Sequence, residues 1–259
     1  MTGRKINMPF VELFVADCFN KPLKQVLHNR IPLDLVSCQF ALHYCFEDEE
    51  TAHKTIKNVS DCLRKGGYFI GTVPDANVII KTLRTKGNLK NGKVGIGNKN
   101  FKIEIDNGDS SDNENDSKNG GKIKLAFPPN KKFGLRYKFH LKNSVDKCDE
   151  FLVHPETLMR LCDSFGLKCD LFQNFHDFYE ETVTMQFEEN DWARELFLNK
   201  VIENTKKIDK TKMFPSEDWE IAGFYAVFAF RKIDGAESKS DSFNQKFRKV
   251  RFLDKSEIK

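Results

Sequence analysis

The stretch Leu33–Asp48, LDLVSCQFALHYCFED, contains the pattern that decides the fold of this chain. Its first half, LDLVSCQF, is a nearly continuous apolar run, which is typical of a strand in a parallel sheet covered on both faces. The end of this run and the residues after it contribute Gln39, His43 and Tyr44, three side chains that can bind a ligand. Acidic residues follow and mark the start of a helix. The stretch therefore predicts a strand, a polar loop at its carboxyl end, and a helix.

The same alternation of strand and helix extends on both sides of this stretch. We expect a strand over 11–16 ending at Asp17, helices over 21–29 and 47–65, a strand over 68–74, and a helix over 75–84 capped by Asp75. Such short spacings predict βαβ units and a parallel sheet. Ligands of these sheets bind at the carboxyl ends of the strands. Because Asp17, residues 39–44 and Pro74 all fall at such ends, we expect them to line one site.

The pattern becomes richer in strands beyond residue 85. Short β-like pieces, KVGIG and FKIEI, precede a polar insertion at about 107–121. An alternating strand then places Leu135, Tyr137, Phe139 and Leu141 on one face. We expect the remaining elements in this order: a helix at 154–166, a strand at 167–175, an amphipathic helix at 190–206, a short helix at 215–223 and a buried strand at 224–232. We expect residues 1–232 to form a single domain and a polar, basic tail to follow it over 233–259.

The composition sets broad limits on function. The chain has 259 residues, 39% of them apolar, which suffices for one sizeable core. Its 42 basic residues face 38 acidic ones, so a polyanionic partner is permitted but not required. Seven cysteines form no C-x-x-C pair and predict reduced thiols in a cytosolic or nuclear protein. No apolar run approaches the ~20 residues that cross a bilayer, so we expect a soluble protein without membrane contact.

Four segments of this chain resemble the cellular mRNA cap guanine-N7 methyltransferases. In chain order they are VSCQFALHYCFED, RKGGYFIGTVPD, YKFHLKNSVDKCDEFLV and EDWEIAGFYAVFAF. The resemblance covers residues 10–231 apart from the insertion. It implies a Rossmann-like α/β fold of class I methyltransferases: a mostly parallel sheet with helices on both faces, plus a smaller β-rich insertion that binds the cap. It also implies methyl transfer from S-adenosylmethionine to N7 of the guanosine cap, without a metal.

The resemblance assigns roles to individual residues. It implies that Asp17, Gln39 and Tyr44 contact the methyl donor. It also implies a guanine pocket formed by His43, Pro74, Phe139, Glu150 and Tyr225. Within this pocket, the resemblance places His43 next to the donor site.

These residue types suit the chemistry of guanine N7. This nitrogen carries no proton, so no general base is expected and catalysis rests on positioning by Glu150, His43 and Tyr225. A carboxylate such as Glu150 can accept hydrogen bonds from the N1–H and N2–H₂ edge of guanine. Aromatic faces such as Phe139 and Tyr225 attract the cationic product by roughly 0.5–2 kcal/mol.

Plainer interpretations stay open for the same residues. Phe139 and Tyr225 lie in strands, where aromatic side chains usually fill the core. Glu150 follows Asp149 and could belong to an exposed acidic turn. His43 could start a helix without touching a ligand, and Asp17 could simply cap the helix that follows it.

The chain departs from the family pattern at its N-terminus. Family members carry a glycine-rich D-x-G-x-G turn before the region matched here, and MTGRKINMPFVELFVAD contains none. We therefore expect the N-terminal βαβ unit to be missing. The leading hypothesis is an mRNA cap methyltransferase that acts on GpppN-capped RNA in the nucleus, with the capping or transcription machinery as a candidate partner. The alternatives are a non-catalytic cap-binding or regulatory relative or a truncated fragment without its own donor site, and a methyltransferase of the same sheet acting on a small molecule.

Overall fold

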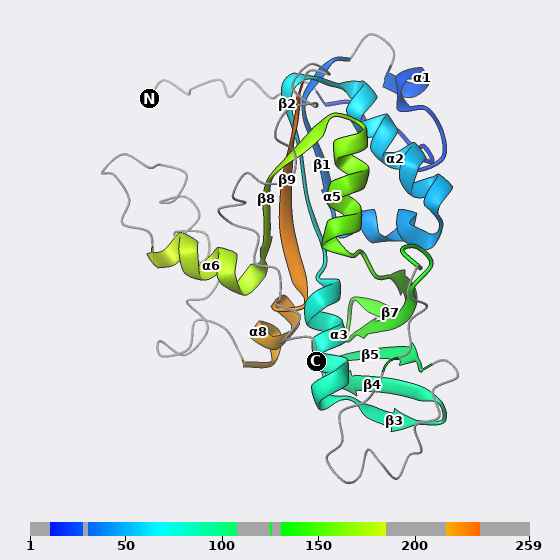
Figure 1. Ribbon diagram of the computed structural model, residues 1–259, viewed down its shortest axis with the longest axis vertical. Helices are drawn as coiled ribbons and strands as arrows, with labels where there is room; N and C mark the ends of the chain where they lie inside the picture. The colour runs from blue at the N-terminus through cyan, green and yellow to red at the C-terminus, as the bar shows by residue number, and fades with distance from the viewer. Residues whose placement is uncertain (1–10, 28–30, 108–124, 126–130, 185–215, 234–259) are drawn as a thin grey trace, which may run out of the picture.

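The computed structural model describes residues 11–27, 31–107, 125, 131–184 and 216–233, which form two sheets with flanking helices (Figure 1). Sheet A contains β1 (Leu33–Gln39), β2 (Leu63–Pro74), β8 (Leu167–Asn174) and β9 (Tyr225–Lys232). Sheet B contains β3 (Asn88–Lys90), β4 (Lys93–Gly97), β5 (Phe101–Asp106), β6 (Arg136–Leu141) and β7 (Val145–Phe151). The helices are α1 (Leu23–Leu27), η2 (Leu42–Glu47), α2 (Glu49–Cys62), α3 (Ala76–Lys86), α5 (Pro155–Ser164), α6 (Phe175–Thr184) and α8 (Ser216–Ala222).

Sheet A has the order β1-β2-β9-β8 and confirms the predicted Rossmann-like α/β class. β1 and β2 are parallel, and β9 lies antiparallel between β2 and β8, so three of the four strands run in one direction. Phe69, Phe228 and Phe230 stack on one face, beneath α2 and α5. The opposite face carries half-buried or exposed side chains, such as Tyr68 and Val227, so in the described part of the chain the helical cover predicted for both faces is seen on one.

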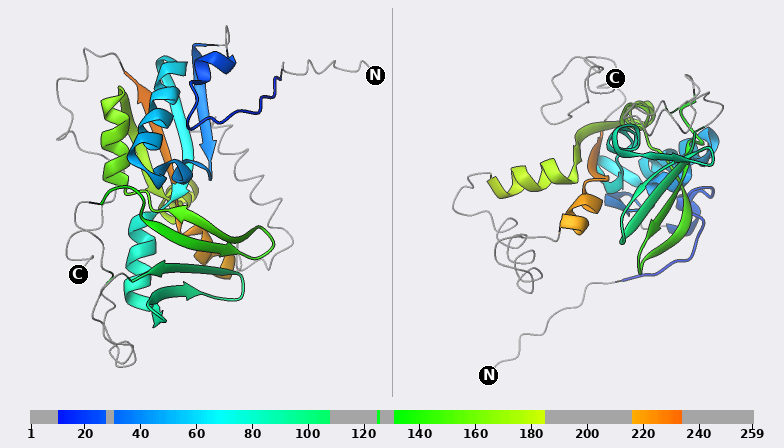
Figure 2. Two further views of the ribbon diagram at one scale, coloured as in Figure 1. Left: turned by 90° about the vertical axis from the view of Figure 1, so that its right-hand side faces the viewer. Right: turned by 90° about the horizontal axis from the view of Figure 1, so that it is seen from below.

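Sheet B is wholly antiparallel, and α3 packs against it to form a second core. The predicted alternation in β6 is confirmed: Tyr137 and Phe139 are buried, while Lys138 between them is exposed. Sheet B lies beyond the carboxyl ends of β1 and β2, as Figure 2 shows from two directions. The expected β-rich unit is therefore a five-stranded sheet placed beside the site-bearing edge of sheet A.

Three expectations from the sequence were wrong in detail. Residues 11–16 form no strand, and Leu13 and Val15 are exposed, because no described strand lies beside them to pair with their backbone. β1 is not buried on both faces: as an edge strand of sheet A it leaves Leu35 52% exposed. Helix α2 ends at Cys62 rather than at the glycine pair, because β2 already begins at Leu63.

Some expectations fall outside the described residues, and some elements were not expected. The predicted helix at 190–206, the tail after 233, and the insertion apart from Asn107 lie outside the described residues. Asn107 itself is buried, at 2% exposure. The sequence pattern did not predict η2, β3, β7 or α6 as separate elements. Of these, η2 and β7 both carry residues of the site described below.

Asp75 is a buried junction between the two halves of the fold. Its Oδ1 accepts hydrogen bonds from the backbone N–H groups of Asn77 and Val78, which confirms it as the cap of α3. Its Oδ2 accepts one from Asn174 Nδ2 at 3.0 Å, and that same amide nitrogen donates to the Gly223 carbonyl at 2.9 Å. Burial raises the pKa of Asp75, although these hydrogen bonds oppose the shift. One carboxylate thus ties β2, β8 and the turn before β9 together.

We expect an Asp75→Ala variant to lose about 2–4 kcal/mol of unfolding free energy, because it leaves the donors of three half-buried residues, Asn77, Val78 and Asn174, without their buried acceptor. Asp48 provides a matched control, since it also caps a helix, accepting from Thr51 N at 2.8 Å, but is exposed. An Asp48→Ala variant should lose about 1 kcal/mol. Urea unfolding of both variants measures the difference, and equal losses would contradict the junction role of Asp75.

Candidate cap-guanine site

The site lies where the carboxyl ends of β1 and β2 meet sheet B. The end of β2 places Pro74 directly opposite Tyr225, the first residue of the antiparallel β9. The end of β1 is followed by Phe40 and then by η2, which carries His43 and Tyr44. Six of the predicted residues therefore gather at this junction, namely His43, Tyr44, Pro74, Phe139, Glu150 and Tyr225.

Glu150 is the best-defined polar group of the site. Its side chain is 5% exposed, so it lies in no exposed acidic turn. Tyr137, its direct cross-strand partner in β6, donates a short hydrogen bond from its hydroxyl to Glu150 Oε2. His43 Nε2 lies 3.5 Å from the other oxygen, Oε1. A buried carboxylate with one oxygen held by Tyr137 and the other left facing His43 is a strong acceptor for a ligand that offers N–H groups.

His43 is buried at 2% exposure and lies beside the ring of Tyr44, with 4.2 Å between centroids. Neither of its ring nitrogens has a hydrogen-bond partner of good geometry among the described residues. Buried polar atoms normally find partners, so these nitrogens are available to a bound molecule. The Tyr44 hydroxyl lies 3.7 Å from Cys148 Sγ on β7, which connects η2 to sheet B.

Aromatic rings form the apolar wall of the site. Tyr225 lies 5.1 Å from Phe40, 5.9 Å from Phe175 and 6.5 Å from Phe139, measured between ring centroids. Phe139 is buried in the second core, as the plainer interpretation held, and still reaches Tyr225. Phe40 is 50% exposed, so part of this wall is open to a ligand. A flat base could stack against such rings.

Phe40 has a backbone conformation that bulky residues rarely adopt, with φ at 52°. Its amide nitrogen donates to Thr72 Oγ1 at 2.8 Å, and Thr72 is buried in β2. This bond holds the turn that leads from β1 into η2. The strained turn therefore aims the ring of Phe40 at Tyr225 rather than into either core.

The phenols of the site all remain protonated at neutral pH. Burial and the neighbouring Glu150 raise the pKa of Tyr137 well above its ordinary value. Burial, followed by the charge of Glu150, raises the pKa of Tyr225. The pKa of Tyr44 is raised by burial, the contact with Cys148 and Glu150. Each phenol can therefore act as a hydrogen-bond donor, and the negative charge that faces a ligand is that of Glu150.

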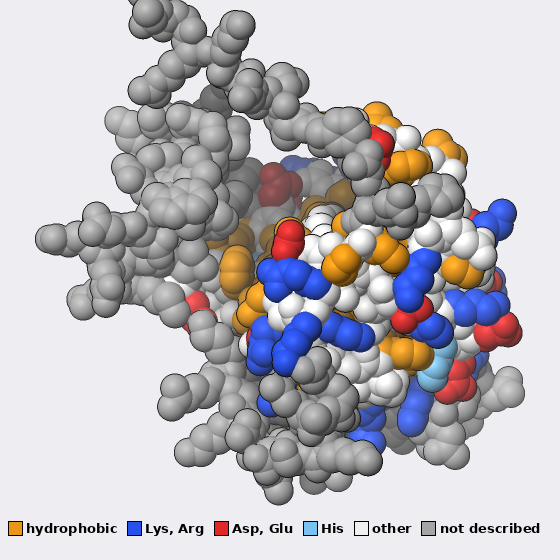
Figure 3. All heavy atoms as spheres, turned by 90° about the horizontal axis from the view of Figure 1, so that it is seen from above, with side chains coloured by type: hydrophobic (Ala, Val, Ile, Leu, Met, Phe, Trp, Pro, Cys, Tyr) orange, Lys and Arg blue, Asp and Glu red, His pale blue; other side chains and the backbone are white. Residues whose placement is uncertain are grey.

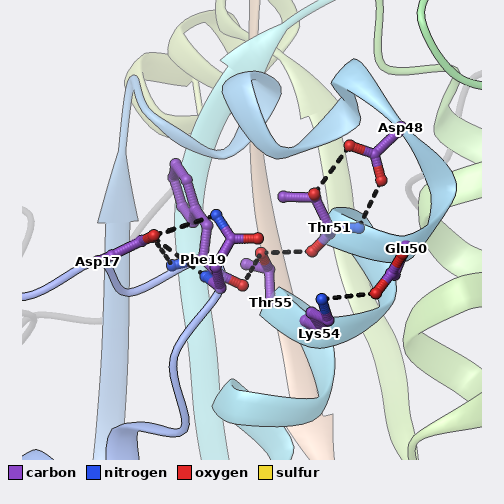
Figure 4. A network of polar contacts seen from close by, with 8 residues as sticks. Asp17, Phe19, Asp48, Glu50, Thr51, Lys54 and Thr55 are labelled. Atoms are coloured by element: carbon purple, nitrogen blue, oxygen red, sulfur yellow. Dashed lines mark hydrogen bonds and ion pairs between the residues drawn. The ribbon is translucent and has the colours of Figure 1, made fainter.

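The residues expected at the methyl donor lie in two places. Gln39 ends β1, is exposed, and donates from Nε2 to Ser37 Oγ at 2.9 Å. It directly precedes Phe40, so its backbone lies at the edge of the site, where β1 leads toward η2. Asp17 instead accepts from the backbone N–H groups of Phe19 and Asn20, in a turn beside Thr55 of α2 (Figure 4). These hydrogen bonds lower the pKa of Asp17, and the described residues show it capping its own turn.

Sequence reasoning missed three residues of the site, namely Tyr137, Phe40 and Phe175. Tyr137 was placed correctly on the buried face of its strand, but its pairing with Glu150 depends on how β6 and β7 align. Phe40 lies within the family segment VSCQFALHYCFED and has a positive φ that no sequence pattern predicts. Phe175 starts α6, a helix that the sequence pattern did not predict.

Basic side chains also gather at the opposite end of sheet A. Figure 3 views this end and shows Lys and Arg side chains interspersed with acidic ones. Arg64 pairs with Asp34, near the start of β1 and β2, and Arg231 pairs with Asp170 at 3.0 Å. These residues lie at the far ends of β2 and β9 from Pro74 and Tyr225. They are therefore not the groups that would meet phosphates next to Glu150.

Two further properties of the described residues concern metal ions and membranes. Among these residues no group of three or more His, Cys, Asp or Glu side chains is arranged to hold a metal ion. None of the helices they form has the length and apolarity needed to span a membrane.

The α/β sheet, its flanking helices and a site at the carboxyl ends of its strands define a domain of the class I methyltransferase type. Residues 3–233 match the mRNA (guanine-N(7))-methyltransferase domain, and the chain belongs to that family.

Relatives from plants, insects and fungi are similar over most of this chain. It is 33% identical over 229 residues to the mRNA cap guanine-N(7) methyltransferase 1 of Oryza sativa, covering 88% of this chain and 55% of the relative. It is 34% identical to the mRNA cap guanine-N(7) methyltransferase of Drosophila melanogaster, covering 78% and 45%, and 31% identical to that of Saccharomyces cerevisiae, covering 86% and 48%. The chain thus spans about half the length of these relatives.

Among solved structures, an S-adenosylmethionine-dependent methyltransferase from Clostridium acetobutylicum aligns at a TM-score of 0.38 with 10% identity, covering 85% of this chain and 63% of that one. A likeness this weak has no bearing on the chemistry.

Proposed function

We propose that this chain binds the guanine of an mRNA cap and takes part in transferring a methyl group from S-adenosylmethionine to its N7. The observation that carries the proposal is Glu150, a buried carboxylate that is held by Tyr137 and lies next to His43, beside an aromatic wall. Guanine offers two adjacent N–H donors, N1–H and N2–H₂, which suit a carboxylate with two oxygens. Family membership supports the same substrate.

The methyl transfer requires positioning rather than proton transfer. The lone pair of guanine N7 forms a bond to the methyl carbon while the carbon–sulfur bond breaks, and its electron pair neutralises the sulfonium. The guanine gains a positive charge and no proton moves. Glu150 and the faces of Tyr225 and Phe139 become more favourable partners as this charge develops. His43, buried and with a free ring nitrogen, is placed to contact the base without acting on a proton.

For the donor, the described residues offer Gln39 and Tyr44 at the edge of the guanine site. An exposed amide and a protonated phenol are suitable partners for the polar groups of S-adenosylmethionine. That molecule would supply a methyl carbon made electrophilic by the attached sulfonium. Asp17 belongs to this proposal through the family pattern, with its carboxylate exposed to solvent. We further propose residence in the nucleus, because caps are made on nascent transcripts.

Titration calorimetry with GpppG and, separately, S-adenosylhomocysteine tests the two halves of this proposal. We expect GpppG to bind the intact chain at least about tenfold more tightly than ApppA, since adenine lacks the N1–H and N2–H₂ donors, and tenfold corresponds to about one good hydrogen bond. We also expect S-adenosylhomocysteine to bind, and label to pass from methyl-labelled S-adenosylmethionine to GpppG-capped RNA. Equal affinity for GpppG and ApppA would contradict the guanine site. GpppG binding without donor binding would favour a non-catalytic cap-binding relative.

A further inference from the structure

We propose that Tyr137 is a positioning residue whose buried hydroxyl fixes the Glu150 carboxylate in the orientation that distinguishes guanine from other purines. The inference rests on the proposed function and adds to it a residue that decides specificity. Neither the sequence pattern nor family membership had assigned a role to Tyr137.

The pairing of β6 with β7 builds this contact into the backbone. Tyr137 and Glu150 are direct cross-strand partners, so their side chains leave sheet B on the same face. Both are buried, at 2% and 4% exposure, and the Tyr137 hydroxyl donates to Glu150 Oε2. The ring of Tyr137 packs in the second core, with Ile103 and Phe139. The donor therefore belongs to a rigid element and has little freedom to follow a moving acceptor.

The second oxygen of Glu150 has a weaker restraint. His43 Nε2 lies 3.5 Å from Oε1, beyond the geometry of a good hydrogen bond. Without Tyr137, the carboxylate would have no close hydrogen bond among the described residues to define its plane. A glutamate side chain has three rotatable bonds, and guanine would then have to order them on binding. The hydroxyl of Tyr137 thus orders the carboxylate before the base arrives.

Oriented in this way, the carboxylate can accept from N1–H and N2–H₂ together, because each oxygen keeps a lone pair beyond the one used inside the protein. Hypoxanthine has the same shape as guanine and keeps N1–H, but it lacks the N2 amine. The ratio of GpppG to IpppI affinity therefore reports whether the carboxylate is oriented to meet both donors, because IpppI carries hypoxanthine at both ends. A general loss of stability lowers both affinities and leaves their ratio unchanged.

Calorimetric titration of the parent chain and a Tyr137→Phe variant with GpppG and IpppI tests this role. We expect the parent to prefer guanine about tenfold, the equivalent of one hydrogen bond, and the variant to retain a preference of only about twofold. Tyr68→Phe is the matched control, because it removes an exposed phenol from β2 and should keep the parent ratio. In a Glu150→Gln background, Tyr137→Phe should change the ratio no further, since the two residues act as one unit.

The outcomes separate this inference from the proposed function. Failure of the parent chain to bind GpppG would overturn both. A guanine preference that is lost in Glu150→Gln but kept in Tyr137→Phe would overturn the role of Tyr137 alone.

A measurement on the wild-type chain applies if the Tyr137→Phe variant does not fold. The hydroxyl proton of Tyr137 should give a downfield NMR signal that shifts on saturation with GpppG, because its acceptor then also serves guanine. A signal unmoved at saturation would overturn the proposal.

Discussion

The Glu150→Ala variant is expected to bind GpppG at least about 100-fold more weakly than the parent chain. The change removes a charged acceptor for two guanine donors, and hydrogen bonds to a charged group contribute about 1.5–3 kcal/mol each. It also leaves the buried hydroxyl of Tyr137 without its acceptor. In a methyl-transfer assay the loss should appear in kcat/KM, because the interaction strengthens as guanine becomes positively charged.

The neighbouring Asp149 supplies the control for Glu150. Its carboxylate lies on the outer face of sheet B, 2.9 Å from Lys138 and 3.6 Å from Arg136. Asp149→Ala therefore removes a carboxylate one residue away from the site, and we expect GpppG affinity within about twofold of the parent, since exposed ion pairs contribute little. Calorimetry gives both affinities, and circular dichroism checks that each variant is folded. Similar losses of GpppG affinity in the two variants would contradict the proposed role of Glu150 in recognising guanine.

The second large effect is expected from Gly71→Ala in the middle of β2, which should lower the free energy of unfolding by about 3 kcal/mol or more. A Cβ atom at Gly71 would lie 2.1 Å from the Cys38 carbonyl oxygen of β1 and 2.4 Å from Phe228 Cζ of β9. Neither neighbour can easily give way, because one is backbone and the other is fully buried in the core. Such a loss is a large part of the ~5–15 kcal/mol typical of a domain.

Gly95→Ala in β4 is the matched control for Gly71. There the added Cβ would meet Glu104 Cγ at 3.4 Å and the Ile103 carbonyl oxygen at 3.5 Å, which are ordinary contacts. We expect unfolding free energy within about 1 kcal/mol of the parent, since alanine also restricts the unfolded chain. Urea unfolding followed by circular dichroism measures both. A Gly71→Ala variant as stable as Gly95→Ala would show that β1, β2 and β9 do not pack as closely as described.

The outcome at residues 11–16 shows where local pattern reasoning fails. VELFVA has the composition of a strand, and the sequence predicted one there. A strand, however, exists only when a neighbour satisfies its backbone groups, and no described strand lies beside this segment. Helix predictions are less prone to this error, because the backbone hydrogen bonds of a helix form within the helix itself. Accordingly α3 was predicted with its cap, Asp75, in place, and α2 was predicted without its cap, Asp48, being identified.

The sequence by itself predicted the α/β class and most strands and helices, because periodicity, caps and turn residues are local signals. The residues of the proposed guanine site came from the resemblance of four sequence segments to the family. Only the tertiary structure decided that β9 lies between β2 and β8, that Tyr137 holds Glu150, and that Phe40 turns toward Tyr225. It also decided that Asp17 caps its own turn. The physical reason is that each of these features depends on strand register and packing between segments far apart in the chain, which local sequence patterns do not encode.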